Sequence, residues 1–231
     1  MLIDLITSRG DLTTILIGLM ASVFVVFCTM PIHEFAHAFV ATKLGDTTPS
    51  RQGRLTLNPL AHIDPIGALM IILVGIGYAK PVPVNARRFK RPKLGMALTA
   101  AAGPVSNLLM ATVCVFLYYV VFILDASFGN SMPDTFPIFH VLQLFFSFAA
   151  TINVSLAVFN LLPIPPLDGS KILAIAIPAK FYFKYMQYER YVRYALLLLV
   201  FVGVLDIPIT FLTETIMSAI SFVVSLPFRL I

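Results

Sequence analysis

The stretch TMPIHEFAHAFVATKLG, from Thr29 to Gly45, carries two histidines and a glutamate at the end of a strongly apolar run. His33 and His37 are four residues apart, so on a helix their imidazoles project from one face about one turn apart. That spacing allows both rings to bind one zinc ion, which takes histidine nitrogens as ligands. Glu34 lies one residue further round the helix, where it could serve a water molecule as a base without binding the metal. The pattern predicts a zinc site with metalloprotease chemistry.

The apolar setting of these residues strengthens the prediction. An ionisable side chain inside a membrane segment costs about 2.5–3.5 kcal/mol on insertion scales, so such groups generally mark function. The alternative is that the two histidines only hydrogen-bond neighbours at a helix end near the membrane interface. The occurrence of His33, Glu34 and His37 together disfavours it.

A catalytic zinc ion takes three protein ligands and keeps an open position for water. The candidates for the third ligand are His62, Asp64, Asp125, Asp134, His140, Asp168, Asp206 and Glu214. Asp168 stands out because it lies in FNLLPIPPLDGSKIL, where an apolar run ends and prolines precede a new helix. Aspartate is also favoured as an N-cap, so Asp168 could instead only cap a helix over Gly169–Ile177. Position alone leaves the two roles open, and the lone histidines His62 and His140 are expected to be structural or interfacial.

The amino-acid composition indicates the kind of protein that contains this site. The 231 residues are 59% hydrophobic and 12% charged, with a mean hydropathy of +0.93. A soluble domain is nearer half apolar and a quarter charged. The sequence therefore predicts an all-α polytopic membrane protein. Without a repeat or a long polar tract, it is one membrane domain over 1–231, with a catalytic core at about 12–180 and C-terminal helices at about 190–229.

Three segments are long and apolar enough to cross a bilayer, which takes about 20 residues. They are Leu12 to about Leu44, Leu94 to Leu124, and Phe136 to Leu162. The apolar segment from Tyr194 to Phe228 is interrupted by Asp206 and Pro208. It is expected to form two short or tilted spans, or a hairpin.

The region between the first and second spans is expected to be irregular. Ile66–Ala79 has only 14 residues and three glycines, which favours a re-entrant segment over a full crossing. The preceding PSRQGRLTLNPLAHIDPIG contains turn-forming residues and a Thr/Leu alternation, and these predict short strands in a β-hairpin. Its strand at about Arg54–Asn58 would hold an extended substrate by adding a strand to an exposed edge.

The net charge of +5 comes from basic loops beside apolar spans and not from a nucleic-acid-binding patch. One loop contains Lys80, Arg87, Arg88, Lys90, Arg91 and Lys93, and another contains Lys171, Lys180, Lys184, Arg190 and Arg193. Basic loops of this kind face the cytoplasm. Residues 43–93 and 163–193 are therefore expected there, with the N-terminus and 125–136 outside. The N-terminus does not have the features of a signal peptide, and Cys28 and Cys114 are expected to be buried free thiols.

Three motifs give the chain a resemblance to a known family. HEFAH (His33–His37), AGPVSN (Ala102–Asn107) and NLLPIPPLDG (Asn160–Gly169) occur in this order and spacing. Together they resemble the site-2 proteases, which are intramembrane zinc metalloproteases. GRLTLNPLAHIDPIG and GYAKPVPVNARRF are similar to the compact subgroup that has a catalytic core and no appended soluble domains. The likeness extends from about residue 15 to residue 180.

The resemblance implies a three-helix catalytic core and one zinc ion per chain, and the C-terminal pair of short helices, expected from the apolar pattern, falls outside the likeness. It implies that Asp168 is the third ligand beside His33 and His37, with Glu34 as the general base. Asn107 and Asn160 would either bind an extended substrate or the developing oxyanion, or hold helices together by hydrogen bonds. Gly103-Pro104 would allow close helix approach and a local kink.

The expected function is hydrolysis of peptide bonds in or near transmembrane segments of membrane proteins, on the cytoplasmic side of a bilayer. A bacterial inner membrane is favoured by the compact form. The competing prediction is a membrane zinc-binding protein that transports or senses the metal without proteolysis. The identity of the substrate, the need for a prior cleavage and the oligomeric state do not follow from the sequence.

Overall fold

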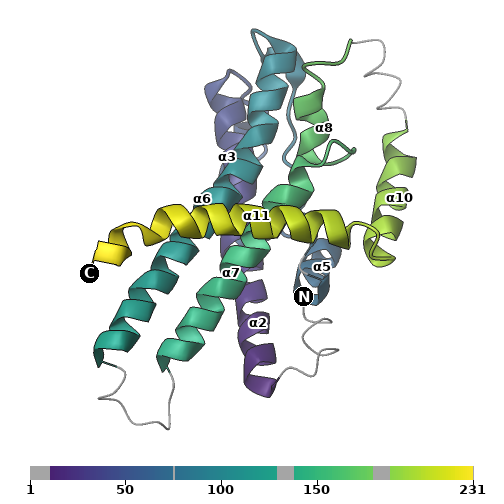
Figure 1. The fold of residues 1–231 in the computed structure, drawn as a ribbon. Helices are drawn as coiled ribbons and strands as arrows, with labels where there is room; N and C mark the ends of the chain where they lie inside the picture. The colour runs from purple at the N-terminus through teal and green to yellow at the C-terminus, as the bar shows by residue number, and fades with distance from the viewer. Residues whose placement is uncertain (1–10, 75, 129–137, 179–187, 231) are drawn as a thin grey trace.

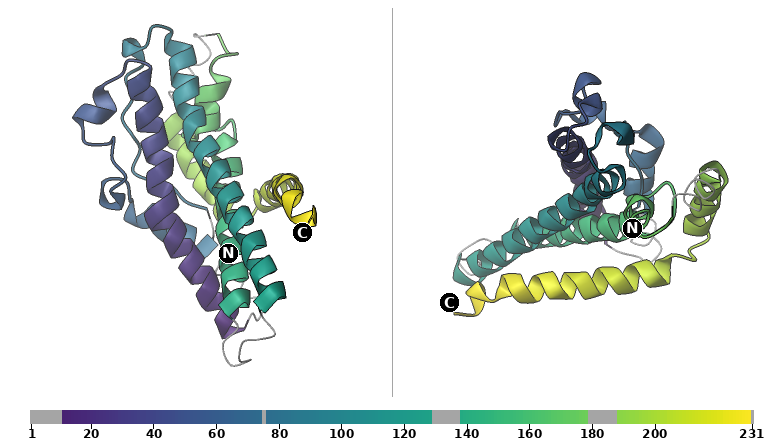
Figure 2. Two further views of the ribbon diagram at one scale, coloured as in Figure 1. Left: turned by 90° about the vertical axis from the view of Figure 1, so that its left-hand side faces the viewer. Right: turned by 90° about the horizontal axis from the view of Figure 1, so that it is seen from above.

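The computed structural model describes residues 11–74, 76–128, 138–178 and 188–230, and all regular structure among them is helical. Three helical rods, α2–α3, α6 and α7, run along the length of the molecule (Figures 1 and 2). Four helices are long and apolar enough to cross a membrane, namely Leu12–Lys43, Pro92–Phe128, Ile138–Leu161 and Asp206–Ser225. The predictions of an all-α fold and of the first three spans are confirmed.

The first span is one continuous helix with a widened turn in its middle. It comprises α2 (Leu12–Phe24), the π-helical segment η1 (Val25–Thr29) and α3 (Met30–Lys43). Asp11 caps its N-terminus by accepting a hydrogen bond from the Thr14 backbone N–H at 3.2 Å. Pro31 has no N–H to donate and its ring crowds the preceding turn, which a π-turn accommodates. The histidine-bearing α3 thus begins directly after a local change in helical pitch.

The second and third spans, α6 (Pro92–Phe128) and α7 (Ile138–Leu161), pack against each other and against the first. Their contact faces contain small buried residues, namely Ala97, Ala100, Gly103 and Ala111 on α6 and Ala149, Ala150 and Ala157 on α7. Small side chains allow helix backbones to approach closely in a membrane, where association depends on van der Waals packing. The three spans therefore form a close-packed unit that can hold side chains in fixed positions.

The connection between α3 and α6 contains α4 (Thr48–Arg51), η2 (Pro59–Ala61), α5 (Pro65–Val74) and η3 (Ala86–Arg88). The predicted β-hairpin is wrong, because residues 49–67 form helical turns and bends without a strand. Side chains bind two backbone carbonyls of this region, those of Thr56 and Ala61, which are then not free for a strand ladder. Arg54 donates hydrogen bonds to the carbonyls of Ala61 and Pro81, and His62 Nε2 lies 2.8 Å from the Thr56 carbonyl oxygen.

The Ile66–Ala79 segment folds back, so that its two ends lie next to each other. The Lys80 backbone N–H donates to the His62 carbonyl at 2.8 Å, so the residues flanking the segment lie side by side. Gly67 makes the turn-back possible, because a Cβ there would lie less than 2.5 Å from the Tyr78 carbonyl oxygen. A helix of 10 residues is also too short to cross a bilayer. These features agree with the predicted re-entrant path.

The C-terminal part consists of α8 (Asp168–Leu173), α10 (Glu189–Phe201), α11 (Asp206–Ser225) and η5 (Pro227–Leu230). The break predicted at Asp206 and Pro208 lies at the start of α11, after a turn in which Gly203 has a φ of 79°. Although α11 is long enough to span, it runs across α6 and α7 in Figure 1 and is seen end-on in the left view of Figure 2.

Candidate metal centre and catalytic cavity

α3 directs both histidines toward one point. Their side chains are buried, and the two Nε2 atoms lie 3.0 Å apart with the rings nearly perpendicular. Two neutral imidazole nitrogens at this distance need a proton or a cation between them, because their lone pairs would otherwise repel. The i, i+4 spacing of His33 and His37 has thus produced the convergence that the sequence predicts.

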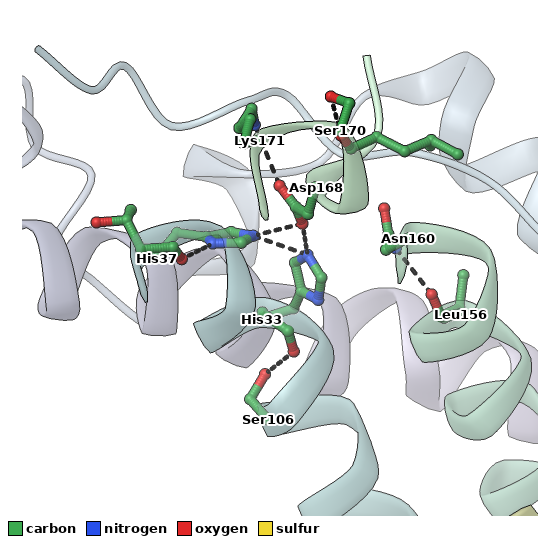
Figure 3. A network of polar contacts seen from close by, with 11 residues as sticks. His33, His37, Ser106, Leu156, Asn160, Asp168, Ser170 and Lys171 are labelled. Carbon is green, nitrogen blue, oxygen red and sulfur yellow. Dashed lines mark hydrogen bonds and ion pairs between the residues drawn. The ribbon is translucent and has the colours of Figure 1, made fainter. Parts of the chain in front are cut away.

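Asp168, which is distant in sequence and is the first residue of α8, lies at the same point. Its Oδ2 lies 3.1 Å from His37 Nε2 and 3.6 Å from His33 Nε2 (Figure 3). Asp168 is the first residue of α8 and Leu167 occupies the N-cap position, so the alternative of Asp168 as an N-cap is not what the structure shows. Burial raises the pKa of the Asp168 carboxyl, but the nearby His37, His33 and Lys171 outweigh this and bring it well below its usual value.

The three donor atoms fit a zinc ion. Zinc bonds of about 2.0–2.1 Å in a tetrahedral arrangement separate the ligand atoms by about 3.3–3.4 Å. The observed separations are 3.0, 3.1 and 3.6 Å, which bracket that distance. Two imidazoles with one carboxylate are also a typical catalytic zinc set. Among the described residues, His33, His37 and Asp168 form the one group of three such ligands.

The second ring nitrogens of the two histidines have different surroundings. His37 Nδ1 lies 2.7 Å from the Thr99 carbonyl oxygen on α6, so Nδ1–H donates there and the Nε2 lone pair remains for a metal. His33 Nδ1 is buried and has no hydrogen-bond partner in the described part of the chain. The orientation of His37 is therefore fixed by a contact between α3 and α6.

Gly103 is the point where α6 passes the ligands. A Cβ added there would lie 2.3 Å from His37 Nε2 and 2.5 Å from His33 Nε2. Only a glycine leaves room for both imidazoles at this position. The close helix approach predicted from the Gly103-Pro104 pair is confirmed.

Glu34 and the metal ligands line one cavity of about 600 Å³. Glu34 is buried, with 6% of its surface exposed, and lies outside the group of ligand atoms. Glu34 therefore lines the same cavity as the metal site and is not among the atoms grouped as possible ligands. Other parts of the cavity wall come from α5 and the chain after it (Met70, Ile76–Pro81), the end of α7 (Leu156, Phe159, Asn160) and α10 (Arg193, Leu196, Leu197, Val200).

The remaining described candidates for the third ligand are outside the group of ligand atoms, although Asp64 lines the same cavity. His62 is buried within the connection between α3 and α6, and Asp64 accepts hydrogen bonds from the backbone N–H groups of Ile66 and Gly67. Asp125 accepts a hydrogen bond from Gln143 near the opposite end of the spans. The others, His140, Asp206 and Glu214, are exposed on α7 and α11, and Asp134 lies outside the described residues.

The two asparagines both line the cavity but differ in their hydrogen bonds. Asn107 is buried, and its Oδ1 has no partner among the described residues. Asn160 Nδ2 donates to the Leu156 carbonyl on its own helix at 2.9 Å, and Oδ1 points away from that carbonyl (Figure 3). The Asn160 bond lies within α7 and does not join two helices.

Three features of the site were missed by sequence reasoning. The Thr99 carbonyl is a backbone group and has no signature in the sequence. The π-turn before α3 has one signal, a proline two residues after Thr29 in an apolar helix. Lys171, whose Nζ lies 3.1 Å from Asp168 Oδ1, could have been found from its position three residues after Asp168 at the start of a helix.

Comparison with known proteins agrees with this geometry. The family model described as "Peptidase family M50" matches residues 19–203, which include every residue of the metal centre. The chain belongs to peptidase family M50. "Putative zinc metalloprotease YwhC" of Bacillus subtilis is 43% identical over 169 residues, which are 73% of this chain and 74% of that protein.

More distant relatives include "Putative zinc metalloprotease Rip2" of Mycolicibacterium smegmatis and of Mycobacterium tuberculosis. They are 32% and 33% identical over 143 residues, which are 60% of this chain and 50% of those proteins. No solved structure matches. The predicted family of membrane zinc metalloproteases is thus confirmed. Zinc is also the metal that the ligand set fits.

Proposed function

We propose that this chain hydrolyses peptide bonds within or near transmembrane segments of other membrane proteins. The observation that carries the proposal is the triangle of His33, His37 and Asp168 in one cavity with Glu34, among helices long enough to span a bilayer. A protease site that cleaves water-soluble peptides would not need to be surrounded by apolar helices. The relatives named as metalloproteases support the same activity.

Each residue of the site has a role in this reaction. His33, His37 and Asp168 would hold the zinc ion, which when bound acts as a Lewis acid toward the scissile carbonyl and the attacking water. Glu34 accepts the proton of that water and passes it to the nitrogen of the leaving amine. This role is supported by the burial of Glu34 and by its place in the lining of the cavity that contains the metal ligands.

A substrate helix must unwind before it reacts, because its carbonyls are hydrogen-bonded and shielded. The predicted strand at Arg54–Asn58 cannot support strand addition, since residues 54–58 form no strand and do not line the cavity. The asparagines are better placed to bind an extended backbone. Asn160 uses one of its two Nδ2–H donors for the Leu156 carbonyl, so Oδ1 remains to accept from a substrate N–H and the second N–H remains to donate to a substrate carbonyl or oxyanion. Asn107 Oδ1 is a second such acceptor.

We further propose that the site faces the cytoplasm of a bacterial cell membrane. The end of α3, the start of α6 and α8 lie at one end of the molecule (Figure 1). These segments contain the basic residues Lys43, Lys93 and Lys171. Basic residues beside spans favour the cytoplasmic side. Cleavage would then occur near the cytoplasmic side of the substrate's transmembrane segment.

The test is a comparison of wild-type protein with Glu34→Gln, each expressed in bacterial cells and followed by mass spectrometry of new N-termini in the membrane fraction. Loss of the base should reduce cleavage by about 10²–10⁴-fold, with zinc content of the purified protein unchanged. Glu214→Gln, on the exposed face of α11, is the matched control and should cleave normally. Unchanged cleavage in Glu34→Gln would overturn the proposal.

The same variant separates proteolysis from metal transport or sensing. A transporter needs ligands along a path across the bilayer, whereas the described part of the chain has one group of three, at a single place. Transport or sensing should survive Glu34→Gln, because Glu34 is outside the ligand set. Hydrolysis should not.

A further inference from the structure

The two oxygens of the Asp168 carboxylate have different partners. Oδ2 faces the two histidine Nε2 atoms at 3.1 and 3.6 Å, and Oδ1 lies 3.1 Å from Lys171 Nζ (Figure 3). One oxygen is thus directed at the metal position, and the other is bound by an ammonium group. The carboxylate therefore has the two histidines on one side and the ammonium group of Lys171 on the other.

The start of α8 produces this arrangement. Asp168 and Lys171 are three residues apart at the start of the helix, so their side chains lie on the same face. The Asp168 side chain is 9% exposed and that of Lys171 is 34% exposed, and both line the cavity. A charge-assisted hydrogen bond in such partly buried surroundings is stronger than a neutral one and fixes the rotation of the carboxylate.

We propose that Lys171 is a positioning residue that makes Asp168 a single-oxygen ligand. With Oδ1 engaged by the ammonium group, only Oδ2 is available to a metal, so the protein supplies three ligand atoms. An unrestrained carboxylate can bind a metal through both oxygens, and together with a water molecule in the open position this would make the metal five-coordinate. Lys171 therefore keeps the site four-coordinate, with three protein ligand atoms and one open position. The inference rests on the proposed metal site.

Cobalt substitution tests this role, because four-coordinate cobalt absorbs visible light more strongly than five-coordinate cobalt. The full-length wild-type protein and the variants Lys171→Met and Lys171→Arg would be purified in detergent and loaded with cobalt. Zinc affinity would be measured on the same samples by chelator competition. Lys93→Met is the matched control, because Lys93 Nζ donates to the Ile177 carbonyl at 2.7 Å and does not contact Asp168.

Lys171→Met should weaken the visible cobalt band relative to wild type and lower zinc affinity about 10–100-fold, as is common when a partner of a metal ligand is lost. Lys171→Arg, which keeps a cationic donor, should retain both properties, and Lys93→Met should match the wild type. A thermal melt of each variant, with Lys171→Gln as a second truncation, separates these effects from a loss of folding.

Three results would overturn the inference. Wild-type cobalt spectrum and zinc affinity in both Lys171→Met and Lys171→Gln would show that Asp168 needs no such partner. Equal losses in Lys93→Met would show that any lost cation has this effect. A wild-type protein that binds neither cobalt nor zinc would refute the metal site and the proposed function together. The wild-type sample alone reveals this result, whereas the first two results require the variants.

Discussion

The ligand-bearing helices and the C-terminal helices differ in how much of their surface is packed. Half of the residues in the most apolar stretch of Leu12–Lys43 are buried, compared with 11% in α11. The core helices meet through alanines and glycines, whereas α11 contacts α6 and α7 with a few buried residues, namely Ile209, Thr213 and Ser225. Close packing is concentrated where side-chain positions must be fixed.

The difference has a physical reason in a membrane. Lipid is as apolar as the helix surface, so hydrophobicity alone does not draw helices together, and close contact requires small residues. Around the site, Gly103 and the Thr99 carbonyl on α6 meet the histidines of α3 directly. α10 and α11 have no metal ligand to place, and α10 supplies only wall residues of the cavity. Substitutions in the core helices should therefore lower zinc affinity, and substitutions in α11 should not.

Asp168→Ala should have the largest effect. It removes one of three metal ligands and leaves two histidines 3.0 Å apart without their carboxylate partner. Zinc content should fall from near one per chain to near zero, and cleavage should fall to background. Metal analysis of the purified protein checks this, and zinc retained at one per chain would show that the third ligand is another residue.

Gly103→Ala should have the next largest effect. The added methyl group would lie 2.3 Å from His37 Nε2, so the helix contact or the imidazoles must shift. We expect zinc affinity to fall by at least about 10–100-fold, the range seen when support for a metal ligand is lost. Chelator competition measures it. Val105→Ile, which adds one methylene group on the exposed side of the same helix, should keep wild-type affinity.

The parts of the site that sequence analysis predicts are those encoded by local spacing. His33 and His37 are one helical turn apart, so the period of the helix places them together. No period connects them to Asp168, which lies on another helix, and only the family resemblance selects it over the N-cap alternative. The length and glycines of Ile66–Ala79 likewise indicate a turn-back that Gly67 makes possible.

The wrong or missing predictions concern contacts between distant segments. Alternation around Leu55 and Leu57 indicates a strand, but Arg54 and His62 satisfy backbone carbonyls that a strand would use. The direction of α11 could not be predicted, because length and hydropathy do not fix the tilt of a helix. The i, i+3 spacing indicates that Lys171 lies near Asp168, but which carboxylate oxygen Lys171 binds depends on the rotation of the carboxylate, which the spacing does not specify.

Thr213→Val should have the smallest effect and is the test of the C-terminal side of the comparison. Thr213 Oγ1 lies 3.3 Å from Ser155 Oγ, a polar contact between α11 and α7. Hydrogen bonds between membrane helices contribute about 0.6 kcal/mol on average, and valine keeps the size of the side chain. The melting temperature should therefore fall slightly, while zinc affinity and cleavage stay at wild-type values. A clear loss of zinc would mean that α11 supports the metal centre through α7, and the division between a precisely packed core and a loosely packed C-terminal pair would then be wrong.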